Sequence, residues 1–200
     1  MVELDKDVKY IKGVGPNRVQ LLNKLNINSL EDLITYFPRT YEDRSIPKKI
    51  YECIDGEEVL IEAMVASRMQ EIRMHGKTMY KLLIRDDTGM ATATWFNQSY
   101  LKNKLEVGKK YKFYGKINNS FGKVFINSPV FDEDGKDAYT GKIIPIYPLT
   151  YNLSQNVLRK IMENGINTVN GNLDETLPEY LIQEYKLLDI NYEIKQILYP

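Results

Sequence analysis

Residues 80–96 read YKLLIRDDTGMATATWF and indicate the class of fold. Every second residue from Tyr80 to Ile84 is apolar, which is the period of a β-strand with one buried face. The DDTG segment at 86–89 has the composition of a tight turn, and residues 91–96 form the next strand. The stretch therefore predicts two strands joined by a turn.

The same alternation recurs on both sides of this hairpin, and a short helix at 98–105 is predicted between the third and fourth strands. The predicted strands are 59–67, 80–84, 91–96, 111–117 and 124–131. This order matches an oligonucleotide/oligosaccharide-binding (OB) barrel. The predicted class is α+β, with a five-stranded OB-type barrel flanked by an N-terminal helical hairpin and C-terminal helices.

In the sequence before and after these strands, the apolar residues recur at helical spacing. Residues 1–50 are expected to form a helical lobe, in which Ser29 caps a helix. Residues 51–132 would be the barrel, and residues 133–200 a proline-containing strap followed by helices. In that last part Ser154 is expected to cap a helix that ends near Gly165, and one helix or a pair is expected within 178–198.

Composition excludes several classes of protein. The chain has 200 residues, a single Cys and a single His, so it cannot form an internal disulfide or supply a four-ligand zinc site. No stretch approaches the roughly 20 apolar residues that span a bilayer. We expect a soluble, cytoplasmic protein without a membrane partner.

Catalytic signals are weak. The phosphate-binding pattern GxxxxGK[ST] is absent from the sequence, so ATP hydrolysis is not encoded here. Cys53 and His75 form an isolated pair without a third orienting group. Asp86 and Asp87 are interpreted as turn residues whose side chains bond to the backbone of their own turn, and not as metal ligands. No catalytic residue, metal or cofactor is predicted for this chain.

Charge is segregated although the net charge is zero. Residues 95–127 contain seven lysines and one acidic residue, and the other segments compensate for the excess. Such local charge is what a phosphate-binding surface needs. The predicted phosphate contacts are Lys102, Lys104, Lys109, Lys110, Lys112, Lys116 and Lys123.

Aromatic residues lie among these lysines, and exposed rings offer faces on which nucleic-acid bases stack. Tyr111, Phe113 and Phe125 are expected to point into the barrel because of their place in the alternation. Phe96 and Tyr100 flank the predicted transition from strand to helix, four residues apart, where helical spacing would place both rings on one face. We therefore predict that these two stack on bases.

The Gly13-Val14-Gly15-Pro16 turn allows two interpretations. It resembles the hairpin of a helix-hairpin-helix element, whose backbone N–H groups can hold a DNA phosphate, with Gly13, Gly15 and Arg18 as possible contacts. A purely structural turn fits the residues equally well.

Three blocks in order carry a resemblance to a known family: IKGVGPNRVQLLNKLNINSLEDLITYFPRTYEDRS at 11–45, RDDTGMATATWFNQSYLKNKLEVGKKYKFYGKI at 85–117 and GKIIPIYPLTYNLSQNVLRKIM at 141–162. Together they resemble the N-terminal region of the RecG family of ATP-dependent helicases, which remodel branched DNA. The resemblance implies a wedge domain that separates strands at a replication fork or Holliday junction in recombination and repair. It also implies that Phe96 and Tyr100 stack on the junction bases.

The resemblance implies further properties of the longer protein. The helicase domains, with ATP and magnesium, would lie downstream, so this fragment is not expected to be an enzyme by itself. Expected partners are branched DNA, the protein's own helicase domains and a single-strand binding protein, and the expected location is the cytoplasm in association with the nucleoid. Two other classes stay open on the residues alone: a free-standing OB-type single-strand binding protein and an OB module that binds a peptide.

Overall fold

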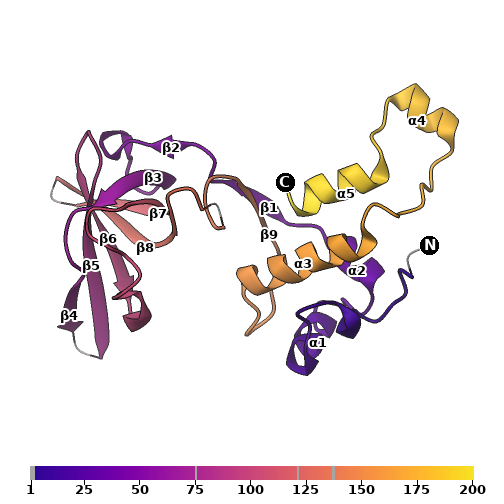
Figure 1. Ribbon diagram of the computed structural model, residues 1–200, viewed down its shortest axis with the longest axis horizontal. Helices are drawn as coiled ribbons and strands as arrows, with labels where there is room; N and C mark the ends of the chain where they lie inside the picture. The colour runs from indigo at the N-terminus through magenta and orange to yellow at the C-terminus, as the bar shows by residue number, and fades with distance from the viewer. Residues whose placement is uncertain (1–2, 75, 121, 137) are drawn as a thin grey trace. The chain divides into compact units, whose positions relative to one another are not determined.

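The computed structural model describes residues 3–74, 76–120, 122–136 and 138–200. The chain divides into two compact units: Met1–Glu42 with Ile144–Pro200, called here the helical unit, and Asp43–Ile143, called the sheet unit. Figure 1 shows the elements of both. This division differs from the three consecutive segments predicted, 1–50, 51–132 and 133–200. The reason is that both ends of the chain contribute to one apolar core.

The helical unit is built from short helices and a two-stranded sheet. Its elements are η1 (Val8–Tyr10), α1 (Pro16–Asn23), α2 (Leu30–Ile34), β1 (Thr40–Asp43), β9 (Ile143–Ile146), α3 (Gln155–Val169), α4 (Glu179–Tyr185) and α5 (Ile190–Leu198). Its core joins Leu22, Leu30 and Leu33 to Leu158, Ile161 and Met162. The predicted strap contains β9, which pairs with β1.

Helix caps follow the predicted positions. Ser29 and Asp32 form a reciprocal capping box at α2, with distances of 3.1 Å from the Asp32 N–H to Ser29 Oγ and 3.0 Å from the Ser29 N–H to Asp32 Oδ2. Ser154 Oγ accepts the Val157 N–H at the start of α3. Both predicted N-caps are confirmed.

The predicted end of α3 at Gly165 is wrong. The helix continues to Val169 and ends at Asn170, whose φ of 48° is left-handed. Gly165 lies inside the helix at a point where α2 packs closely against it. A Cβ at this position would lie 2.6 Å from Leu33 Cδ2. The glycine marks a close helix–helix approach and not a helix end.

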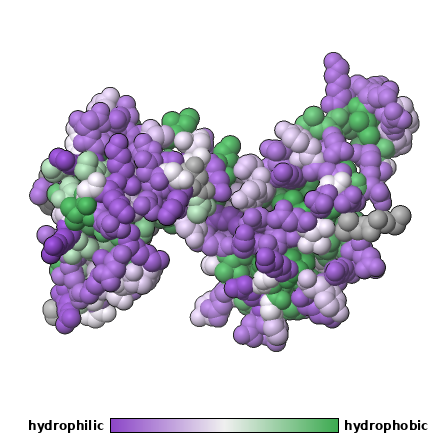
Figure 2. Space-filling view, in the orientation of Figure 1, coloured by the Kyte–Doolittle hydropathy of each residue, from purple (hydrophilic) through white to green (hydrophobic). Residues whose placement is uncertain are grey.

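The C-terminal region forms a pair of helices, α4 and α5, as the sequence allowed. Leu198 of α5 is buried, whereas α4 has no buried residue. Figure 2 shows hydrophobic residues among hydrophilic ones in the region of α4. None of the helices in the described residues has the length and apolar character needed to span a membrane.

The sheet unit contains the predicted strands and two more. Its elements are β2 (Pro47–Lys48), η2 (Ile50–Glu52), β3 (Glu58–Val65), β4 (Gln70–Met74), β5 (Lys77–Arg85), β6 (Met90–Phe96), η3 (Ser99–Leu101), β7 (Lys110–Ser120) and β8 (Lys123–Glu133). The five predicted strands correspond to β3, β5, β6, β7 and β8. The residues at 98–105 form the single turn η3 and further turns in place of the predicted short helix.

Strand pairing in the sheet unit returns on itself. The order is β2-β3-β7-β8-β6-β5-β4, and β3 also pairs with β5 through Met64–Arg85 and Val65–Ile84. The neighbours β6 and β8 are parallel, while the other pairs among β3, β5, β6, β7 and β8 are antiparallel. Five strands therefore pair in a circuit, and β2 and β4 lie outside it.

The core of the sheet unit confirms the inward orientation of Tyr111 and Phe113, both buried. Phe125 is only half buried, so its predicted inward orientation is wrong, and Ile126 fills the core in its place. Ile126 and Phe131 both contact the core although they are five residues apart, so the alternation of β8 changes between them. The change coincides with a shift in the pairing of β7 and β8 between Tyr114 and Lys116. One shift of register exchanges the two faces of a strand, which places Phe125 on the outer face.

Candidate nucleic-acid interface

Phe96 is the last residue of β6 and lies on the face of the sheet turned away from the core. Its neighbour Trp95 is 1% exposed, whereas Phe96 is 46% exposed. Beyond it, Asn97 ties the end of β6 to β5: its N–H donates to Thr78 O at 2.8 Å, and its Oδ1 accepts the Thr78 N–H at 2.9 Å. The exposed ring therefore stands on a fixed backbone.

Tyr100 lies in η3 and is 63% exposed. Its hydroxyl donates to Gln98 Oε1 at 2.9 Å, and Lys104 Nζ lies 5.1 Å from its ring centroid. The turn beneath it is held by Leu101 and Leu105, which belong to the core. A cation beside an exposed ring is a combination that suits a stacked base and its phosphate.

The predicted helical relation between Phe96 and Tyr100 is wrong. Phe96 belongs to a strand, and the left-handed Asn97, with φ of 54°, separates it from η3. Among the described residues no ring contact joins the two side chains. Both are exposed at the end of β6, and their role in base stacking stays a prediction.

The predicted lysines lie in the turns at 102–109 and on the strands β7 and β8. Lys102 forms an ion pair with Glu71 of β4, and hydrogen bonds from Lys102 and Arg73 lower the pKa of that carboxyl. Lys109 lies 2.9 Å from Glu106 Oε1 and 3.6 Å from Glu133 Oε1. Lys102 and Lys104 share a loop with Tyr100, and both Lys102 and Lys109 are paired with acidic side chains.

The remaining lysines lie on β7 and at the start of β8. Lys112 is opposite Glu62 of β3 and Asp132 of β8, and Lys116 is opposite Glu58. In contrast, Lys110 is opposite Met64, and Lys123 is opposite Ser120. Acidic residues on the neighbouring strands thus reduce the positive charge that residues 95–127 carry in the sequence.

The Gly13–Pro16 turn belongs to the helical unit and is held by side chains. Gly13 has a φ of 90°, and Pro16 is the first residue of α1. Arg18 Nη1 donates to Gly13 O at 2.5 Å, and Asn164 Nδ2 of α3 donates to Lys12 O at 2.7 Å. These two hydrogen bonds stabilise the turn without a ligand, and a phosphate contact there stays a prediction.

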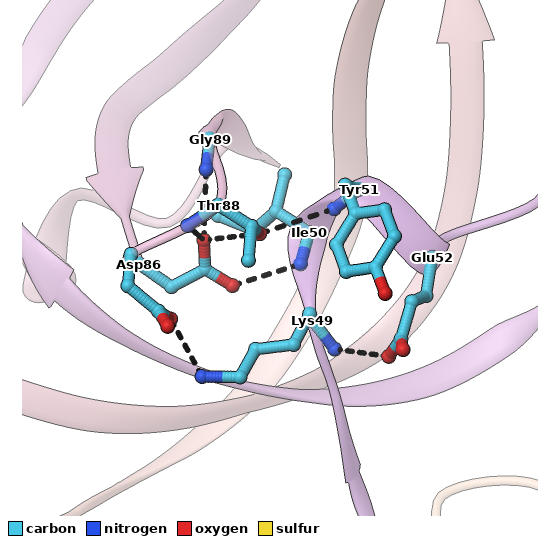
Figure 3. Close-up of polar contacts among 8 residues, drawn as sticks. Lys49, Ile50, Tyr51, Glu52, Asp86, Thr88 and Gly89 are labelled. Carbon is cyan, nitrogen blue, oxygen red and sulfur yellow. Dashed lines mark hydrogen bonds and ion pairs between the residues drawn. The ribbon is translucent and has the colours of Figure 1, made fainter.

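The DDTG turn is structural, as Figure 3 shows. Asp86 accepts the N–H groups of Thr88 and Gly89 at 2.7 and 2.9 Å, and the Ile50 N–H at 2.8 Å. Burial raises the pKa of this carboxyl, but the hydrogen bonds outweigh burial, so the pKa is lowered. Within the described ranges no group of three or more His, Cys, Asp or Glu side chains could hold a metal ion.

Cys53 is buried, and burial raises the pKa of its thiol to about 11. Its Sγ donates to the carbonyl oxygen of Lys49 at 3.4 Å. A raised pKa disfavours the thiolate that a nucleophile needs. His75, the other member of the candidate pair, lies outside the described residues.

Comparison with known proteins identifies the family. The family model described as the RecG wedge domain matches residues 7–169. The chain belongs to the RecG wedge domain family. The ATP-dependent DNA helicase RecG of Thermotoga maritima is 37% identical over 194 residues, which cover 94% of this chain and 24% of the relative. The RecG helicase of Bacillus subtilis is 29% identical over 195 residues, 96% of this chain and 28% of the relative.

A solved structure of RecG bound to a three-way DNA junction matches this RecG wedge domain with a TM-score of 0.87 and 34% identity. The match covers 97% of this chain and 27% of that chain. The present chain thus spans about a quarter of the length of its RecG relatives.

Sequence reasoning missed the neighbours of Phe96 on the outer face. Met79 of β5 is its register partner, and Ile72 of β4 is opposite Met79 in turn. β4 itself was not predicted. The alternation around Tyr80 indicates the buried face of β5. The basic and apolar residues between the buried ones indicate the composition of its outer face.

Proposed function

We propose that this RecG wedge domain binds branched DNA, such as a replication fork or a Holliday junction, and divides its strands in an ATP-dependent helicase. The observation that carries the proposal is the match, over 97% of this chain, to RecG bound to a three-way DNA junction. We assign ATP hydrolysis, and the magnesium that it needs, to the part of the RecG relatives that this chain does not span, about three quarters of their length.

The circuit of strand pairs supports a finer proposal, that the sheet unit is a five-stranded OB-type barrel. OB folds bind oligonucleotides on one face and its adjoining loops. Phe96 ends one of the strands in the circuit, and Tyr100 lies in the turn that follows it. The two rings are therefore proposed to stack on the bases that a branch point exposes.

Charge completes the proposed mechanism. Lys104 beside the Tyr100 ring, with Lys102 two residues before it, would attract the phosphates next to a stacked base. Stacking on a ring and attraction to a phosphate do not depend on base identity, so recognition would be of branched shape with little sequence preference. The longer protein's helicase domains would move duplex past the divider, and a single-strand binding protein is a further proposed partner at the nucleoid.

The test measures fluorescence anisotropy of the 200-residue chain with a fork, a matched duplex and a matched single strand at two salt concentrations. Fork binding should exceed duplex binding and weaken with salt. The double variant Phe96→Ala/Tyr100→Ala should weaken it at least about 10-fold, because each stacked ring contributes about 1–3 kcal/mol.

Tyr51→Ala is the matched control. Tyr51 is also an exposed ring in the sheet unit, but it adjoins the DDTG turn at the other end of the β5–β6 hairpin. The Tyr51→Ala variant should bind the fork with the same affinity as the unmodified chain. Equal affinity for single strand and fork would indicate a single-strand binding protein, and absence of salt-dependent DNA binding would favour a peptide-binding module.

A further inference from the structure

The sequence contains two Asn-Gly pairs, Asn164-Gly165 and Asn170-Gly171, and the structure places one inside α3 and the other at its end. In such a pair the backbone nitrogen of the glycine can attack the side-chain amide carbon of the asparagine, because glycine has no Cβ to obstruct the approach. The reaction needs a backbone that can rotate and a glycine N–H that is not held in a hydrogen bond. The two pairs differ in both respects.

The pair Asn164-Gly165 is held inside the helix. Gly165 is buried in α3, where each backbone N–H donates to the carbonyl oxygen four residues earlier. Nδ2 of Asn164 donates to Lys12 O at 2.7 Å. Gly165 also lies against Leu33 of α2, so the backbone cannot rotate here without moving a buried side chain. The fold therefore protects this pair from the reaction.

The pair Asn170-Gly171 lies just beyond the helix. Both residues are exposed, and both are left-handed, with φ of 48° at Asn170 and 72° at Gly171. Within the described ranges, neither the Gly171 N–H nor the Asn170 side-chain amide forms a hydrogen bond. A Cβ added to Gly171 would meet no atom within 4 Å. Helix ends also open more readily than helix interiors, so this pair has the freedom that the other lacks.

We infer that Asn170-Gly171 is a site of spontaneous deamidation, which changes the end of α3 covalently. The Gly171 nitrogen loses its proton and forms a bond to Cγ of Asn170. The bond from Cγ to Nδ2 breaks, and the amide nitrogen takes up the proton and leaves as ammonia. Water then adds across one of the two C–N bonds of the cyclic imide. Opening at Cγ gives aspartate, and opening at the backbone carbonyl carbon gives isoaspartate.

Both products alter the end of α3. The C-terminal end of a helix carries the negative end of its dipole, so a new carboxylate there is unfavourable. Isoaspartate also turns the Asn170 carbonyl group, which accepts Asn172 Nδ2 at 3.1 Å, into a carboxylate outside the backbone. Asn170 lines a cavity of about 350 Å³ together with Ile34 of α2 and Ile194 of α5. Conversion should therefore destabilise the helical unit where these three helices meet.

The first experiment compares the two pairs. The folded 200-residue chain is incubated at mildly alkaline pH, and peptide mass spectrometry measures the conversion of each asparagine. Asn170 should convert at least about 10-fold faster than Asn164, because Gly165 can react only when the helix opens locally. In concentrated urea the two rates should be similar, since both asparagines are then followed by glycine in an unfolded chain.

The second experiment uses variants. Asn170→Gly removes the reactive amide and keeps a residue that favours the left-handed conformation. Methylation by an isoaspartyl methyltransferase should fall to background in this variant after incubation. Asn152→Gly is the matched control, because Asn152 is also exposed and left-handed, with φ of 67°, but is followed by Leu153. Its methylation should equal that of the unmodified chain, and far-UV circular dichroism verifies that each variant is folded.

The outcomes decide the inference. After incubation the unmodified chain should unfold at a lower urea concentration than before, whereas Asn170→Gly should not change. Equal conversion of Asn164 and Asn170 in the folded chain would overturn the inference, and so would conversion of neither. An unchanged urea midpoint after full conversion of Asn170 would overturn the proposed effect on stability.

Discussion

Single residues decide how closely the helices of the helical unit pack. Gly165 has no side chain, which lets Leu33 of α2 lie against the backbone of α3. Leu33 is fully buried, so it has little space into which it could move. A residue that resembled a helix terminator in the sequence is therefore part of a helix contact.

Gly165→Ala should destabilise the chain by about 1–3 kcal/mol, because the new Cβ would overlap Leu33 and overpack the core. The free energy of unfolding in urea measures the effect. Gly15→Ala is the matched control: its φ is −92° and a Cβ there meets no atom within 4 Å, so the change should be below about 1 kcal/mol. An unchanged or increased stability of Gly165→Ala would contradict this account, since alanine is the better helix former.

At the scale of elements, one carboxylate joins two parts of the sheet unit. Asp86 closes the turn between β5 and β6 and also accepts the N–H of Ile50, the first residue of η2. The sequence predicted that this aspartate would bond to its own turn, and that is confirmed. The bond to η2 joins positions 36 residues apart and could not be read from local pattern.

The lowered pKa of Asp86 makes stability depend on pH. A carboxyl whose pKa is lower in the folded chain contributes stability that is fully present above its unfolded pKa, near 3.9, and is lost as pH falls through the folded value. Asp86→Asn keeps one acceptor but does not titrate. We expect the stability advantage of the unmodified chain over Asp86→Asn to shrink as the pH is lowered from 7 to 3 in urea titrations. A difference that is constant over this range would show that the carboxylate's charge contributes nothing.

At the scale of the whole molecule, the sequence of the sheet unit interrupts the sequence of the helical unit. The sheet unit has a core drawn entirely from residues 43–143. The helical unit needs both ends of the chain, because Leu30 and Leu33 share their core with Leu158 and Ile161.

We therefore expect the excised segment 43–143 to fold by itself and residues 1–42 to remain unfolded alone. Circular dichroism and the dispersion of amide resonances would show cooperative unfolding for the former and a disordered chain for the latter. A folded 1–42 peptide would contradict the shared core.

Local sequence patterns were enough to locate the five main strands, the caps at Ser29 and Ser154, and Phe96 and Tyr100 as exposed rings. These depend on periodicity and on hydrogen bonds between near neighbours, which a local pattern records. Those patterns did not show that Phe125 leaves the core, that a helix continues through Gly165 or that both ends of the chain share one unit. They also did not show which lysines lie opposite acidic residues and which, like Lys77 and Lys81, do not. Each of these depends on pairing between residues far apart in the chain, where a shift of one position exchanges the faces of a strand.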